Sequence, residues 1–177
     1  MHTHFYLCWL HYPPEQLQLT NIDELKSKIS KSDFTSVKEQ ISRVNQTLQK
    51  KKGDKHLKKV DNKTFTYTVS NEKMKQRFKD VGLKDAALAY SSDPGFNKVD
   101  WHVFSVEIWM SHDTVQAIII AGAAAVGTVI AYYFPTLIPF MVSSISVALI
   151  SFYSDKWAEP LYIDIGYFGD INSFHTY

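Results

Sequence analysis

The chain has 177 residues, of which 45% are hydrophobic, 14% aromatic and 21% charged, a balance that excludes a mainly disordered, collagen-like or low-complexity protein. The net charge of +1 conceals two different halves: residues 1–100 hold 18 basic and 12 acidic residues, whereas residues 101–177 hold 1 and 6. The single cysteine, Cys8, cannot form an intramolecular disulfide, so the fold must be stable without covalent cross-links.

Helical periodicity dominates the beginning of the chain. Apolar residues at positions 22, 25 and 29 predict a short helix. A longer amphipathic helix is predicted next, beginning near Ser32 or Asp33 and closed by Gly53. Its apolar positions recur at spacings of three and four residues: Phe34, Val37, Ile41, Val44 and Leu48.

The middle of the chain combines a strand, a helix and a linker. Residues 63–69 alternate in polarity like a strand, and a helix is predicted from a cap at Ser70 or Asn71 to a stop at Gly82. The run Ser91–Gly95 (Ser-Ser-Asp-Pro-Gly) is the predicted linker. It divides a basic mixed α/β region, residues 1–95, from a second region, residues 96–177.

Two strands are predicted in the second region. Residues 99–110 are rich in β-branched and aromatic residues and predict one strand, with Phe104, Val106, Ile108 and Met110 on one face. Apolar residues at positions 161, 163 and 165, following Pro160, predict another.

The segment between these strands is the strongest signal in the sequence. The 41 residues from Thr114 to Ser154 contain no Asp, Glu, Lys, Arg or His. Pro135 divides them into 21 and 19 residues, and each half as a helix is about as long as the ~30 Å bilayer core is thick. Asp113 and Gln116 predict a capping box at the start. Residues 114–154 are therefore predicted to form a hydrophobic helical hairpin.

A hairpin returns its two ends to the same place, so the flanking strands are expected to pair antiparallel as a β-α-α-β unit. The predicted fold class is α+β: amphipathic helices with short strands, plus this β-α-α-β unit containing the hydrophobic helical hairpin.

A helix that is apolar on every side must be enclosed by protein or by lipid. Taking ~0.3–0.6 kcal/mol for each Leu, Ile, Val or Phe, the first half of the hairpin favours membrane insertion by about 2–5 kcal/mol and the second by about 3–5 kcal/mol. Residues 113–155 resemble, in architecture, pore-forming bacteriocins and colicin-type domains. In those proteins amphipathic helices shield a hydrophobic hairpin in water, and the hairpin then enters a target bilayer.

The resemblance implies a membrane-active protein, a bacteriocin-like or toxin-like antimicrobial pore former. Such a protein is secreted or cytoplasmic before insertion and membrane-associated afterwards. One alternative is an integral membrane accessory protein, of the immunity or holin-like kind, and another is a soluble binding module with a buried hairpin. The residues expected to enter lipid are Ile118, Ile119, Ile120, Val126, Ile130, Tyr132, Tyr133, Phe134, Pro135, Pro139, Phe140, Ile145, Leu149 and Ile150.

A cluster of six lysines is the predicted contact to lipid headgroups, because each lysine near an anionic leaflet contributes ~1 kcal/mol. A solvated loop is the alternative interpretation. The expected partner is a lipid bilayer. Assembly into a homo-oligomer within the membrane is compatible with this interpretation. No nucleic acid is expected, because the basic region lacks an arginine-rich or helix-turn-helix signature. The cluster comprises Lys50, Lys51, Lys52, Lys55, Lys58 and Lys59.

No enzyme, cofactor or metal site is predicted. The sequence has no phosphate-binding glycine loop, no His-Glu-x-x-His and no Gly-x-Ser-x-Gly. Four residues of types that bind metals occur near the N-terminus, but their spacing fits no closed zinc site. They are His2, His4, Cys8 and His11.

Titratable residues surround the base of the predicted hairpin. His102, His112 and Asp113 are a candidate acid sensor, with polar positions at a strand end and a cap as the alternative. Glu107 and Asp164 lie on the two strands expected to pair, and we expect them to face each other. Without a substrate cleft, these like charges repel rather than catalyse.

Overall fold

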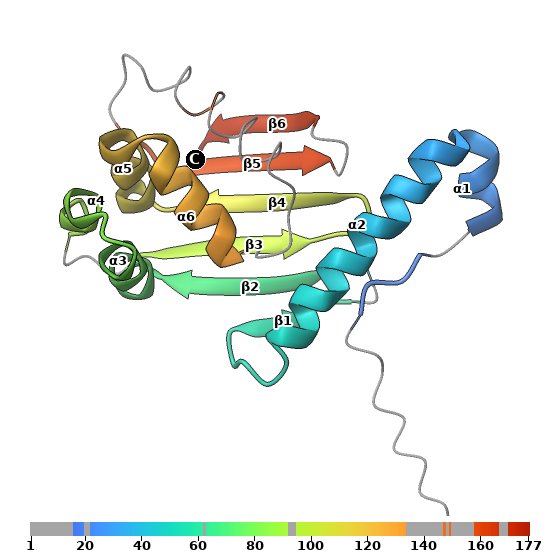
Figure 1. Ribbon diagram of the computed structural model, residues 1–177, viewed down its shortest axis with the longest axis horizontal. Coiled ribbons are helices and arrows are strands. Elements are labelled where there is room, and N and C mark those ends of the chain that lie inside the picture. The colour runs from blue at the N-terminus through green and yellow to red at the C-terminus, as the bar shows by residue number, and fades with distance from the viewer. Residues whose placement is uncertain are drawn as a thin grey trace, which may run out of the picture.

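Residues 16–19, 22–61, 63–91, 95–133, 147, 149, 158–166 and 170–177 are described here from a computed structural model of the chain (Figure 1). They form an α+β fold with a six-stranded, open antiparallel sheet in the order β1-β2-β3-β4-β5-β6. The predicted α+β class is confirmed. The elements are α1 (Ile22–Lys28), α2 (Lys31–Lys50), β1 (Leu57–Lys59), β2 (Phe65–Ser70), α3 (Asn71–Asp80), α4 (Lys84–Leu88), β3 (Phe96–Trp101), β4 (Ser105–Met110), α5 (His112–Ala121), α6 (Ala123–Tyr133), β5 (Leu161–Gly166) and β6 (Ile171–Thr176).

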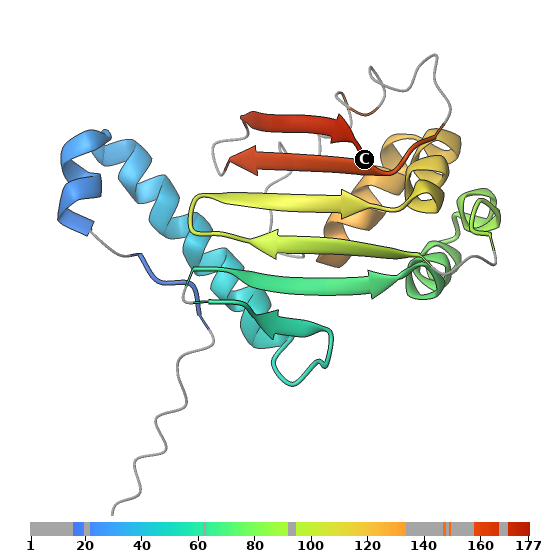
Figure 2. The same ribbon diagram turned by 180° about the vertical axis from the view of Figure 1, so that it is seen from behind.

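The helices and the sheet form two layers. Helices α2 and α6 lie across one face of the sheet, and α3, α4 and α5 gather at one end of it (Figure 1). Seen from behind, the other face carries none of the described helices (Figure 2). The buried apolar side chains of the strands belong to the helix-covered face, which gives the strands their alternating burial. They are Phe65, Tyr67, Val69, Val99, Trp101, Val106, Ile108, Met110, Leu161, Ile163 and Ile165.

One hydrophobic core joins residues from both predicted regions. It extends from Leu17 and the inner side of α2 to Ile165 on β5. Strands β2 and β3 belong to different predicted regions, and they pair along six residues, from Phe65↔Trp101 to Ser70↔Phe96. The two regions therefore contribute neighbouring strands to one sheet.

The helices predicted in the first half are confirmed. Helix α2 begins at Lys31, one or two residues earlier than expected, because the Ser30 side chain accepts a hydrogen bond from the backbone N–H of Asp33. Ser70 caps α3 in the same way. Gly53 and Gly82 follow these helices with φ of 82° and 81°, a left-handed conformation that favours glycine.

The prediction of one continuous strand over residues 99–110 was wrong. The chain turns at residues 102–104, where the backbone N–H of His102 donates to the carbonyl of Ser105 over 2.9 Å. β3 and β4 form a hairpin in which Trp101 lies opposite Val106. Positions 101 and 106 would point to opposite faces of a single strand, whereas here both side chains are buried in the core. Phe104, predicted to share the buried face, lies in the turn and is 50% exposed.

The structure also corrects the first half of the predicted helical hairpin, residues 114–134. Ser111, rather than Asp113, caps α5 and accepts from the backbone N–H of Thr114. Residues 114–134 do not form one helix, because Gly122, with φ of 62°, separates α5 from α6. Val147 and Leu149 are described in the second half; its other residues lie outside the described part of the chain.

The predicted pairing of the flanking strands is confirmed. β4 and β5 pair antiparallel along six residues, from Ser105↔Gly166 to Met110↔Leu161. The ends of the intervening segment, residues 111–160, therefore meet at the same end of the sheet. β6, which the sequence analysis did not predict, extends the sheet beyond β5.

Two glycines provide a test of the break between α5 and α6. Gly122→Ala should lower the free energy of unfolding by about 1–2 kcal/mol, because an L side chain is strained at positive φ. Gly127→Ala, inside α6 where an added Cβ meets nothing within 4 Å, should instead raise it by about 0.5–1 kcal/mol. Urea denaturation measures both; stabilisation by the two substitutions alike would indicate one continuous helix.

Candidate functional site

The residues predicted to enter lipid are found in two different environments. Ile118, Val126 and Leu149 are buried in the core, with exposed fractions of 3%, 1% and 1%, so they are not presented to a membrane in this fold. Ile119 and Ile120 lie on the outer side of α5 and are 43% and 50% exposed. The remaining predicted side chains lie outside the described ones: Ile130, Tyr132, Tyr133, Phe134, Pro135, Pro139, Phe140, Ile145 and Ile150.

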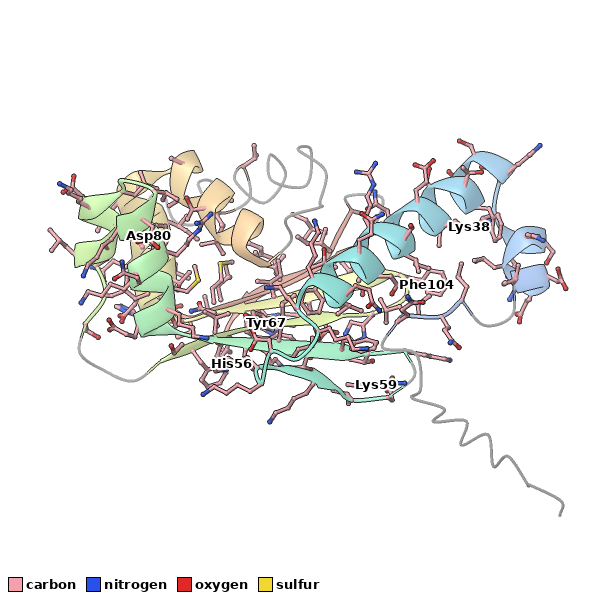
Figure 3. All side chains as sticks on the ribbon, turned by 60° about the horizontal axis from the view of Figure 1, so that its bottom comes forward. Lys38, His56, Lys59, Tyr67, Asp80 and Phe104 are labelled. Atoms are coloured by element: carbon pink, nitrogen blue, oxygen red, sulfur yellow. The ribbon has the colours of Figure 1, made fainter. Side chains whose placement is uncertain are left out.

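The lysine cluster lies between the end of α2 and the edge strand β1. Lys59 is on this edge strand, away from Lys38 of α2 (Figure 3). Lys51 differs from the other five lysines, which are exposed. Its ammonium group lies 3.9 Å from the centre of the Tyr67 ring, and burial lowers its pKa. Lys51 therefore packs on the sheet, and the exposed lysines remain as the predicted headgroup contacts.

Tyr67 also connects the lysine cluster to a turn. Its hydroxyl donates to Asp54 Oδ2 over 2.9 Å, and the His56 ring packs edge-on against the Tyr67 ring (Figure 3). The backbone N–H of His56, more than the Tyr67 hydroxyl, lowers the pKa of Asp54. The turn before β1 is thus held against the sheet.

The fold separates His102 from the other two residues of the candidate acid sensor, His112 and Asp113. Asp113 is buried at the start of α5, where its Oδ2 accepts from Asn71 Nδ2 over 3.0 Å and from the backbone N–H of Ser91 over 3.1 Å. His112 Nδ1 lies 3.3 Å from Asp113 Oδ1. His102 belongs to the turn between β3 and β4, at the opposite end of these strands. The Asp113 network joins the starts of α3 and α5, so its evident role is structural.

The helix-free face of the sheet carries two cross-strand rows of polar and aromatic side chains. The first row runs Thr66, Asp100, Glu107, Asp164, Ser173, and the second runs Thr68, Lys98, Trp109, Tyr162, His175. The second row stacks along the sheet: the Lys98 ammonium lies 3.4 Å from the centre of the Trp109 ring, and the Trp109 and Tyr162 ring centres are 5.0 Å apart. Glu107 lies opposite Asp164, as the sequence predicted.

Titratable side chains of the acidic row lie close to His102 at the turn between β3 and β4. Single ligand atoms of Asp100, His102 and Glu107 all lie within 4.8 Å of one another. His102 Nε2 is 3.5 Å from Glu107 Oε1. Asp100 Oδ1 accepts from Thr66 Oγ1 over 2.7 Å, while Lys98 Nζ lies 3.2 Å from Asp100 Oδ2. Sequence reasoning did not join Asp100 or His102 to Glu107, although residues 98, 100 and 102 alternate as one strand face should.

Asp164 and Tyr162 complete this group on β5. Asp164 Oδ1 is buried and has no hydrogen-bond partner among the described residues. Burial raises the pKa of Tyr162 to about 12, and the negative charges of Glu107 and Asp164 act in the same direction. Tyr162 therefore stays protonated beside the carboxylates. The buried Asp164 oxygen is costly, because no described hydrogen-bond donor compensates its burial.

No protein-family model matches the chain, and comparison with curated proteins and with solved structures finds no significant match. Within the described ranges, no helix has both the length and the apolarity needed to cross a bilayer.

Two substitutions distinguish the carboxylates of the acidic row. Asp164→Asn should raise the free energy of unfolding by about 0.5 kcal/mol, because it removes a like charge directly opposite Glu107. Asp100→Asn also removes a like charge opposite Glu107, but it should lower the free energy of unfolding by about 1 kcal/mol, because both Asp100 oxygens have partners, in Thr66 and Lys98, whose loss costs more. Urea denaturation at neutral pH measures both, and equal destabilisation by the two would contradict this assignment.

Proposed function

We propose that the protein acts at lipid membranes through residues 114–154. The observation that carries the proposal is the exposure of Ile119 and Ile120 on α5, inside a 41-residue run that contains no charged residue or histidine. Leu88, which is 80% exposed, lies on α4, and α4 packs against α5. Exposed aliphatic side chains on two neighbouring helices provide apolar area that a membrane surface can cover.

The proposed sequence of events begins with surface contact. Ile119 and Ile120 enter the headgroup region while the fold is intact, and the exposed lysines add attraction to anionic lipid. Deeper insertion then requires α5 and α6 to leave the sheet, because Val115, Ile118 and Val126 are buried in the core. α6 carries no charged residue, so its transfer into lipid buries no ion.

The stronger form of the proposal is a bacteriocin-like or toxin-like pore former. In this form α5 and α6 supply the first arm of the hydrophobic hairpin, and residues 136–154 supply the second. Association with the membrane surface without leakage would support membrane action but not pore formation. Dye release from vesicles would support the pore former.

The double substitution Ile119→Asp with Ile120→Asp tests the proposal. Partitioning onto vesicles of mixed anionic and zwitterionic lipid should fall at least about tenfold, because covering one half-exposed isoleucine contributes about 1 kcal/mol. Co-sedimentation with the vesicles measures the bound fraction, and circular dichroism confirms that the variant is folded.

Ile22→Asp is the matched control, because Ile22 is 42% exposed, like Ile119, but lies at the start of α1, apart from α4, α5 and the lysine cluster (Figure 1). It should partition like the original chain. Equal loss in the control and the double variant, or no partitioning by the original chain, would sink the proposal. Recovery of the expressed chain only with detergent would instead favour the integral accessory protein.

A further inference from the structure

A histidine and two carboxylates converge on the helix-free face, at the β3–β4 hairpin. We propose that His102, Glu107 and Asp100 bind a divalent transition-metal ion of the Zn²⁺ or Mn²⁺ class. This proposal is independent of membrane action, because it concerns the sheet face away from α5 and α6.

The spacing of the three side chains fits one ion. One ligand atom from each residue lies within 4.8 Å of the other two. Two ligand atoms that are each about 2.1 Å from one metal ion lie roughly 3–4 Å from each other. Side-chain rotations that move the ligand atoms by about 1 Å therefore bring all three onto a common ion. One imidazole with two carboxylates suits a borderline divalent ion such as Zn²⁺ or Mn²⁺ better than a soft ion, which prefers sulfur.

Neighbouring hydroxyl groups already orient two of the proposed ligands. Thr64 Oγ1 lies 3.2 Å from His102 Nδ1, so an Nδ1–H donating to Thr64 would leave the Nε2 lone pair directed toward Glu107. Thr66 donates to Asp100 Oδ1 over 2.7 Å. Partners of this kind fix the tautomer and the orientation of metal ligands and raise metal affinity.

The charge distribution independently favours a bound cation at this position. Asp100, Glu107 and Asp164 occupy adjacent cross-strand positions, an arrangement in which like charges destabilise a sheet. Asp164 Oδ1, opposite Glu107, is buried and lacks a hydrogen-bond partner among the described residues. A bound cation beside Glu107 would reduce the repulsion among these carboxylates.

Lys98 is the cation that competes with a metal ion. Its ammonium group lies 3.2 Å from Asp100 Oδ2 and also over the Trp109 ring. The aromatic contact can hold Lys98 after Asp100 turns to a metal ion. A like charge so close must still weaken metal binding, so removing it should strengthen binding.

The test is calorimetric titration of the full chain, freed of metal with a chelator, with ZnCl₂ and separately with MnCl₂. We expect saturable binding of at least one of the two ions. His102→Ala and Glu107→Gln should weaken it by at least about tenfold, because each removes a ligand. Lys98→Met should strengthen it by about threefold or more. Circular dichroism of the metal-free variants checks that each is folded.

His112→Ala is the matched control, because it removes a histidine next to an aspartate at the other end of β4. It should bind metal like the original chain. Binding that is absent for both ions, or that His102→Ala and His112→Ala change equally, would overturn the proposal. The second result would assign the bound ion to other ligands, such as the histidines and cysteine at positions 2, 4, 8 and 11.

Discussion

The antiparallel pairing of β4 with β5 is the constraint on which the rest of the structure depends. It joins two segments separated by residues 111–160, and closing so long a connection costs conformational entropy. Burial of both strands offsets this cost: Val106, Ile108 and Ile163 are at most 1% exposed. The same register places the start of α5 and the approach to β5 at one end of the sheet. It also fixes Glu107 opposite Asp164 on the other face.

Local periodicity was sufficient where one face of an element is buried. The helices α2 and α3 and the strand β5 were predicted because their apolar residues recur at the spacing of the element. The break at Gly122 was not predictable in this way, because every residue around it is compatible with a continuous apolar helix. Its positive φ reflects where α6 must lie over the sheet, which is a tertiary requirement.

The candidate metal ligands were missed because a second break in the chain, the turn between β3 and β4, was also not recognised from the sequence. The turn at residues 102–104 contains neither glycine nor proline, so β3 and β4 were read as one strand. In a single strand, positions 100 and 107 point to opposite faces, and Asp100 has no relation to Glu107. The hairpin brings them opposite each other on the same face. The pairing of Glu107 with Asp164 was predictable because it depended only on the antiparallel pairing of two correctly identified strands.

The two faces of the sheet impose different costs on the two proposals. Insertion of α5 and α6 into lipid must take Val115, Ile118 and Val126 out of the core, so membrane action competes directly with the core. A metal ion on the opposite face joins β3 to β4 without touching that core. It would therefore stabilise the β3–β4 pair without holding the helices against the sheet. If both proposals hold, the sheet is a stable base while residues 114–154 move from the protein core into lipid.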